Sequence, residues 1–265
     1  MNAVAETKRL GRLERSALTG VLVREAVNYS SYWKSSTFSS TVEPTIYLLA
    51  FGFGFGSLVS KIGGLDYVQF VGSGTVATAV LFSSAFPAMF GTFVKYQFQR
   101  TYDAILAAPV DTEELVTAEA VWVATRAGVY GCVPMLVAMA FGLDPSWGMF
   151  AVPLINWLAG FGWASFGIAV AGYAKSIENF NYVVSAVLTP LFLLAGSFFP
   201  LDQFPTWAKV LANLNPLHHC VVLVRDAVIY GWNGWVDVGR LGVLVLFGLL
   251  VWRVAIRAMT QKLVD

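Results

Sequence analysis

The sequence predicts an all-α integral membrane protein with six transmembrane helices. Of its 265 residues, 57% are apolar and only 12% are charged, about half the charged share of an ordinary soluble domain. A soluble domain of this length would need far more than 17 basic and 16 acidic side chains to cover its surface. Six apolar stretches are also long enough to cross a hydrocarbon core of about 30 Å, which takes about 20 helical residues. Their approximate bounds are 38–59, 68–93, 118–141, 148–172, 181–199 and 236–256.

The segment before the first span predicts an interfacial helix over residues 10–34. Residues 1–20 have charges every few positions and no apolar core before a cleavage site, so we do not expect a secretory signal. The mixture of apolar and basic residues suits a helix that lies in the membrane interface, with Trp33 as its anchor. The alternative is a solvated charged tail. The helix prediction rests on Leu10, Leu13, Leu18, Leu22, Val23, Arg12, Arg15, Arg24 and Lys34.

The distribution of lysine and arginine predicts that both termini are cytoplasmic. Basic residues near the ends of spans are retained on the cytoplasmic side during insertion. With the N-terminus inside, twelve basic residues fall on the cytoplasmic side and four on the outer side, and an even number of spans agrees with this. The outer four are Lys61, Lys209, Arg225 and Arg240; the inner twelve are Lys8, Arg9, Arg12, Arg15, Arg24, Lys34, Lys95, Arg100, Lys175, Arg253, Arg257 and Lys262.

The first span carries a GxxxG pair formed by Gly52 and Gly56, a spacing that lets a neighbouring helix approach closely. The surrounding FGFGFG differs from a dinucleotide-binding loop, because no strand precedes it and no acidic residue follows about 20 positions later. The pair is therefore interpreted as a helix-packing feature.

The first of two long connections, residues 95–117, is expected to contain a short apolar helix. Pro109 stops this helix, because proline lacks a backbone N–H, and Asp111 or Thr112 caps the next one. The apolar residues of the short helix are Tyr102, Ile105 and Leu106.

The second long connection, residues 199–235, predicts re-entrant half-helices on the outer side. It is too apolar for a solvated loop, yet Pro200, Pro205 and Pro216 divide it into pieces too short to span. Irregular backbone at membrane depth has to be buried against protein. We therefore expect the pieces to turn back within the outer leaflet, with Trp207 at headgroup level.

Catalytic and metal-binding motifs are nearly lacking in the sequence. No Walker A sequence occurs, so the chain is not expected to bind nucleotide by that route, and HExxH, GxSxG and CxxC are missing. His218 and His219 are adjacent and point about 100° apart on a helix, so no metal site is predicted. Cys132 and Cys220 are interpreted as packing residues.

Charge inside the spans is also sparse. Only Glu43 and Arg126 qualify, each within about two turns of the cytoplasmic end, where they can pair with headgroups or with each other. The net charge of +1 gives no basis for binding nucleic acid. A helix that can dock onto a partner, attached to a bundle without a visible energy source, is typical of a transport subunit that a partner drives.

Two segments carry a family resemblance that extends over nearly the whole chain. YQFQRTYDAILAAPVDTEELVTAE resembles the coupling-helix segment of type-2 ATP-binding-cassette (ABC-2) exporter permeases, in the branch of nodulation protein J-like lipooligosaccharide and drug exporters. LTPLFLLAGSFFPLDQFPTWAKVLANLNPLHH resembles the end of their fifth span and their outer re-entrant helices.

The resemblance implies one transmembrane domain, residues 1–265, that works as a homodimer or with a related permease. Two copies of a separate ATPase subunit would bind ATP and Mg, and this chain would bind no cofactor. Ile105 and Leu106 would enter a groove of the ATPase subunit, while Arg100 and Asp103 fix the register. Gly52, Gly56 and Gly196 would line the translocation route. The implied coupling residues are Arg100, Tyr102, Asp103, Ile105, Leu106 and Pro109.

The resemblance further implies a multi-pass protein of the bacterial inner membrane that exports an amphiphilic, lipid-linked or hydrophobic passenger. The 20 phenylalanines and 9 tryptophans suit such a passenger and equally suit surfaces that face lipid. Two other classes stay open: an ion-coupled carrier or channel, and an integral membrane enzyme that modifies lipids. A Walker-containing ATPase encoded beside this chain would separate the exporter from both.

Overall fold

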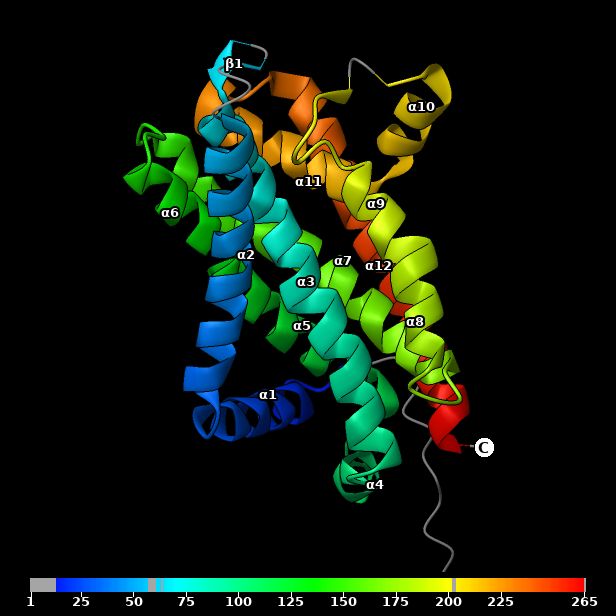
Figure 1. Cartoon of the computed structure of the whole chain (residues 1–265). Helices are drawn as coiled ribbons and strands as arrows, with labels where there is room; N and C mark the ends of the chain where they lie inside the picture. Colours follow the sequence, from blue (N-terminus) through cyan, green and yellow to red (C-terminus); the bar gives the residue numbers. More distant parts are fainter. Residues whose placement is uncertain (1–12, 57–60, 63, 202–203, 265) are drawn as a thin grey trace, which may run out of the picture.

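The computed structural model describes residues 13–56, 61–62, 64–201 and 204–264, which form a helical bundle with one short hairpin (Figure 1). The hairpin pairs β1 (Lys61–Ile62) antiparallel with β2 (Leu65–Asp66). The helices are α1 (Arg15–Ser30), α2 (Trp33–Gly56), α3 (Tyr67–Gln97), α4 (Thr101–Leu106), α5 (Thr112–Tyr130), α6 (Val133–Ala140), η1 (Trp147–Ala151), α7 (Val152–Tyr173), α8 (Asn179–Val183), η2 (Val184–Leu188), α9 (Thr189–Leu193), α10 (Thr206–Leu214), α11 (Pro216–Arg225), η4 (Asp226–Tyr230) and α12 (Gly234–Val264). Of these, η1 is a 3-10 helix, and η2 and η4 are π-helical.

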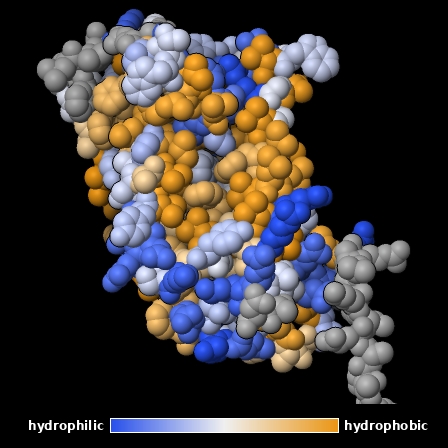
Figure 2. All heavy atoms as spheres, turned by 90° about the vertical axis from the view of Figure 1, so that its right-hand side faces the viewer, coloured by the Kyte–Doolittle hydropathy of each residue, from blue (hydrophilic) through white to orange (hydrophobic). Residues whose placement is uncertain are grey.

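The long helices run between two ends of the molecule (Figure 1). α1 lies across the end where α4 is found, and α10, α11 and the hairpin lie at the opposite end. We call these the α4 end and the α11 end. Figure 2 shows apolar side chains over the middle of one face and polar side chains gathered toward the α4 end. A band of this kind is what a bilayer requires.

The prediction of an all-α chain is confirmed for the described residues, apart from the hairpin. Four stretches of this part of the chain are long and apolar enough to cross a membrane: Tyr67–Gln97, Thr112–Ala140, Trp147–Tyr173 and Gly234–Leu263. They overlap four of the predicted spans. The other two predicted spans coincide with α2 and with the shorter run Asn179–Leu193. The count of six therefore stays a prediction.

Two stretches differ from the continuous spans that the sequence predicted. The third breaks between α5 and α6 at residues 131–132, because Pro134 lies in the first turn of α6 and cannot continue the ladder from α5. The fifth begins as α8, widens into η2 ahead of Pro190 and ends at Leu193, six residues before the predicted end at 199. Gly196 then turns the chain with φ +80°.

α3 and α7 form the centre of the bundle, where small residues let the helices approach closely. A Cβ atom added to Gly167 of α7 would lie 2.8 Å from Ala88 Cβ of α3, and one added to Gly172 would lie 2.8 Å from Ala258 Cβ of α12. Contacts this short exclude any larger side chain. These crossings fix the scaffold that positions both ends of the bundle.

Candidate functional site

The candidate site lies at the α4 end, where the chain reverses between α3 and α5. Arg100 has a left-handed backbone, φ 53°, and this turn redirects the chain into α4. Pro109 follows the last turn of α4, in agreement with its predicted role as a stop. The N–H of Asp111 then donates to Glu114 Oε2 at 3.0 Å and helps to cap α5.

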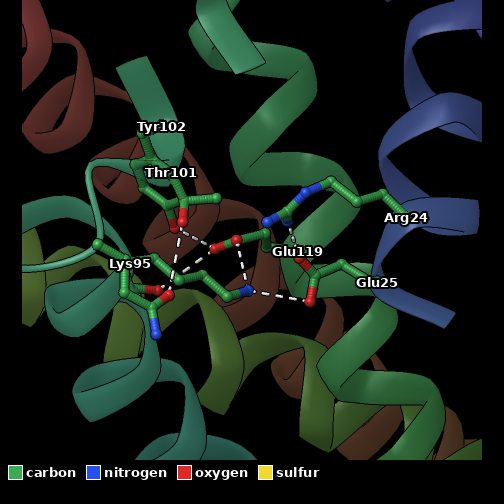
Figure 3. A network of polar contacts seen from close by, with 8 residues as sticks. Arg24, Glu25, Lys95, Thr101, Tyr102 and Glu119 are labelled. Atoms are coloured by element: carbon green, nitrogen blue, oxygen red, sulfur yellow. Dashed lines mark hydrogen bonds and ion pairs between the residues drawn. The ribbon is translucent and has the colours of Figure 1, made fainter. Parts of the chain in front are cut away.

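Glu119 of α5 is the centre of a buried polar network at this reversal (Figure 3). Its carboxylate accepts hydrogen bonds from Tyr102 of α4, from Lys95 of α3 at 2.8 Å and from Thr92 of α3 at 3.4 Å. The Glu119 side chain is only 4% exposed, so these donors replace the water that it loses. Burial, reinforced by the Glu119 carboxylate, raises the pKa of Tyr102 well above 10.0, which keeps its hydroxyl a donor.

Lys95 extends this network to α1. Its ammonium also donates to Glu25 Oε2 at 2.9 Å, and Glu25 Oε1 accepts from Arg24 Nη1 at 2.7 Å (Figure 3). The Glu25 side chain is 3% exposed. A charge buried in this way is stable only while its partners stay in place. One set of side chains therefore joins α1, α3, α4 and α5.

A second contact fixes the start of α1 to α5. Glu114 Oε1 accepts the N–H of Glu14 at 2.6 Å.

Val23, which the sequence placed in the apolar part of an interfacial helix, is exposed on the side away from the bundle. Leu10 and Arg12, also used for that prediction, lie outside the described residues. The residues that α1 buries against the bundle, four positions apart, are Ala17, Val21 and Glu25.

The structure divides the six predicted coupling residues between the interior and the surface. Tyr102 is 1% exposed, so it acts inside the chain through Glu119. Arg100 and Asp103 are exposed and pair with each other at 3.6 Å. Ile105 and Leu106 are half-buried against this chain's own core. Pro109 is exposed. The apolar side of α4 therefore faces the bundle more than the sequence suggested.

Beside the exposed Asp103, the surface of α4 and of the turn that follows it presents small side chains, namely Ala104 on α4 and Ala107 and Ala108 in the turn. Beside it, a groove of about 380 Å³ separates α1 from the connection that follows α4. Apolar side chains of both segments form most of the groove, and Glu14 and Arg24 contribute to its lining. Small residues leave room for another backbone to approach. This surface can therefore accept an apolar side chain of a second protein.

At the α11 end, side chains on or next to α11 hold the end of α9. The last carbonyls of a helix have no partners within the helix, and here three side chains bond to one carbonyl of α9 and to two in the turn that follows it. Burial lowers the pKa of His218, so its ring stays neutral and donates from Nδ1. The pairs are Asn215 Nδ2 with Leu191 O at 2.7 Å, His218 Nδ1 with Ala195 O at 2.9 Å and Arg225 Nη2 with Gly196 O at 3.3 Å.

The predicted outer residues lie at the breaks between these elements. Pro200 follows the turn after α9, Pro205 precedes α10, and Pro216 is the first residue of α11. Trp207 on α10 is 65% exposed, as an interfacial tryptophan would be. Re-entry of this segment into a membrane stays a prediction.

Charged residues at the α11 end are more buried than the sequence suggested. Arg225, counted as a boundary charge, stacks its guanidinium 3.9 Å from the Phe70 ring. Arg240, also counted as a boundary charge, donates to Asp226 at 2.8 Å and to the fully buried Asp237 at 2.6 Å. The sequence placed Arg225 and Arg240 among the outer basic residues, and their contacts with Phe70, Asp226 and Asp237 were not expected.

Of the two charges that the sequence did select, the structure describes the side chain of Arg126. Arg126 Nη2 donates to Ser36 Oγ at 2.6 Å, and its guanidinium lies 4.7 Å from the Tyr29 ring. The side chain of Glu43 lies outside the described part.

The three glycines predicted to line a route all face neighbouring elements of this chain. A Cβ atom on Gly52 would lie 3.6 Å from Val68, and one on Gly56 would lie 3.8 Å from Tyr67. Gly196 is buried below Leu201. The contacts at Gly52 and Gly56 are ordinary van der Waals distances, whereas Gly196 is favoured by its positive φ of +80°. The part of all three glycines in a route stays a prediction.

A polar and aromatic groove of about 460 Å³ does lie between α2 and α3. Phe82, Phe86 and Phe90 recur every four residues on its α3 wall, and successive ring centroids are 5.3 Å and 6.3 Å apart. Ser40 and Tyr47 contribute hydroxyls from α2. The groove therefore offers both ring faces and hydrogen-bonding groups to an amphiphile.

Sequence reasoning missed the buried network at the α4 end. Glu25 and Lys95 are 70 residues apart, so no local pattern links them. One signal was available in the sequence. Lys95 begins the connection 95–117 and Glu119 follows shortly after it, so both charges lie next to apolar stretches, where charge is costly.

Comparison with known proteins agrees with the resemblance. The model of the ABC-2 type transporter family matches residues 17–229. Nodulation protein J of Sinorhizobium fredii is 31% identical over 90% of this chain and 92% of its own length. Nodulation protein J of Neorhizobium galegae is 30% identical over 96% and 99%, respectively. The inner membrane transport permease YadH of Escherichia coli is 27% identical over 87% of this chain and 90% of its own length.

Proposed function

The chain belongs to the ABC-2 type transporter family, and we propose that it is the membrane-spanning permease subunit of an ATP-driven exporter. Members of this family are integral membrane transport subunits, and the family in general implies an ABC ATPase partner. In this proposal, two copies of a separate ATPase subunit bind ATP and Mg. The permease pairs with a second copy of itself or with a related permease.

The polar network around Glu119 is the observation that supports this function most directly. In the proposal, the ATPase subunit docks on the exposed alanines of α4 and of the turn after it, and in the groove beside α1. Closure of the ATPase subunits then moves α4. Because Tyr102 bonds to Glu119, and Lys95 bonds to both Glu119 and Glu25, this movement reaches α3, α5 and α1 together.

The passenger in this proposal is amphiphilic, lipid-linked or hydrophobic. The groove between α2 and α3 supports such a passenger, because it combines phenyl rings with hydroxyl groups and has no charged lining residue among those described. The predicted topology has six spans in the bacterial inner membrane, with both termini and the α4 end on the cytoplasmic side. The name of YadH, an inner membrane transport permease, is in keeping with that location.

The proposal is tested by recovery of the ATPase subunit, which we expect to be encoded beside this chain. Ala107→Arg places a guanidinium on the exposed surface directly after α4 and should weaken docking by about 2 kcal/mol or more, roughly thirtyfold. The measurement is co-purification of the ATPase on a tagged permease, followed by ATP turnover of the complex. Asn233→Arg, at the α11 end, is the matched control and should leave both unchanged.

Unchanged recovery and turnover with Ala107→Arg would show that α4 is not the docking helix. Export by the purified permease in vesicles with a proton gradient, without the ATPase and without ATP, would instead identify an ion-coupled carrier.

A further inference from the structure

A cavity of about 430 Å³ between α7, α8 and α12 is separate from the grooves described above. Its walls are apolar, with Phe166 and Val170 from α7, Val183 from α8, and Val251 and Val254 from α12. Tyr173, Ala174 and Asn179 surround its end near the turn between α7 and α8. The cavity thus has a long apolar part and one polar end.

The packing of α8 explains why this space is open. Phe180 of α8 lies in the core, with its ring centroid 4.9 Å from Phe90 and 5.4 Å from Phe93 of α3. This contact holds α8 toward α3. α12, in contrast, is held against α7 by the close approach of Gly172 to Ala258. The two helices therefore diverge and leave the cavity between them.

The length of the cavity matches part of one membrane leaflet. Its α7 lining runs from Phe166 to Ala174, which is about 12 Å at 1.5 Å per residue. One leaflet contributes about 15 Å of hydrocarbon.

The elements that form the polar end carry basic side chains. Lys262 Nζ donates to the carbonyl of Ala174 at 3.1 Å, which places its ammonium next to a lining residue. Lys175 follows in the chain and is exposed. Arg257 and Arg253 of α12 are exposed as well, against one exposed acid, Glu178, in the α7–α8 turn. Basic clusters at a membrane surface attract anionic headgroups.

We propose that this cavity binds an acyl chain of an anionic phospholipid from the leaflet at the α4 end. The chain fills the apolar space behind α8, and the phosphate lies near Lys262 and Lys175. The lipid thereby supports α8. Of the five residues of this helix, only Phe180 is buried in the chain itself. This inference requires only that the chain is embedded in a membrane, so it does not depend on the ATPase.

The test counts lipids on the full chain in mild detergent by native mass spectrometry, with dioleoyl phosphatidylglycerol or dioleoyl phosphatidylcholine added. The wild type should retain one phosphatidylglycerol per chain in preference to phosphatidylcholine. Val254→Phe puts a ring into the cavity and should abolish this retention. Leu250→Phe, one turn away at an exposed position that does not line the cavity, should keep it.

The headgroup is tested with lysine variants. Lys262→Gln should reduce the preference for phosphatidylglycerol about fivefold, the weight of one basic residue near an anionic surface. Lys61→Gln, on the hairpin at the α11 end, should not change it.

Three results would overturn the proposal. In the first, the wild type retains both lipids equally. In the second, the folded Val254→Phe variant still retains phosphatidylglycerol. In the third, that variant changes its oligomeric state without a change in bound lipid. If Val254→Phe does not fold, Val183→Phe fills the same cavity from α8 and gives the same readout.

Discussion

Replacement of Lys95 by methionine tests the network that joins α4 to the rest of the bundle. The apolar stem is kept, but the ammonium that bonds to Glu119 at 2.8 Å and to Glu25 at 2.9 Å is lost. Both carboxylates are at least 96% buried, so water cannot replace the lost donor. We expect Lys95→Met to destabilise the folded chain strongly.

The magnitude follows from the partners that remain. Removing one member of a buried ion pair costs about 3–5 kcal/mol. Glu25 keeps Arg24, and Glu119 keeps Tyr102 and Thr92, so we expect the lower end, about 3 kcal/mol. For a chain of this size, that corresponds to a fall in Tm of about 6–12 °C.

The assay is thermal unfolding of the purified chain in detergent, followed by tryptophan fluorescence. Lys95→Met combined with Glu119→Gln should recover about half of the loss, because the introduced glutamine is uncharged and its amide oxygen still accepts from Tyr102. Lys34→Met is the matched control at an exposed lysine and should cost less than about 1 kcal/mol. A fall in Tm below about 3 °C for Lys95→Met, or strictly additive effects in the double variant, would refute the reasoning.

Two further predictions concern the α11 end and the centre of α3. A Cβ atom on Gly74 would lie 2.6 Å from the Cα of Ser197, so Gly74→Ala should lower the unfolding free energy by about 1–3 kcal/mol. A Cβ atom on Gly91 of the same helix would meet no atom within 4 Å, so Gly91→Ala should be stabilising. Equal Tm shifts in the two variants would contradict this prediction. Burial and the neighbouring Asp237 raise the pKa of Asp226 from 3.8 to about 6, so the folded state binds this proton more tightly than the unfolded state does. The resulting stabilisation of the folded chain is present at low pH and is lost as the pH rises through 6. From pH 7 to pH 5 the wild type should therefore gain Tm relative to Asp226→Asn, and parallel Tm curves of the two proteins would argue against the shifted pKa.

Local signals in the sequence located the short elements well. Pro109 and Asp111 mark the gap between α4 and α5, and Pro205 and Pro216 mark the starts of α10 and α11. Each signal acts through one or two neighbouring residues, because proline removes a backbone donor and aspartate caps a helix. The early end of α9 also had such a signal in Gly196, whose positive φ ends the helical run.

Contacts between distant segments could not be predicted in the same way. A six-residue helix such as α4 is too short for its periodicity to show which side is buried, so the inward position of Tyr102 was not visible. Arg225 and Arg240 look like boundary charges in the sequence, because their partners Phe70 and Asp226 lie on other elements. Such pairs are set by the tertiary packing and not by the local pattern.

The contact between Glu14 and Glu114 has a consequence for biogenesis. It joins residues 100 positions apart, and synthesis proceeds at about 5–20 residues per second. α1 is therefore made roughly 5–20 s before the acceptor that fixes its start. Lys95, the partner of Glu25, follows it by 70 residues, so α1 is synthesised before either partner is available. The order of translation therefore leaves α1 without these contacts until α3 and α5 have been made, and α6 to α12 follow later.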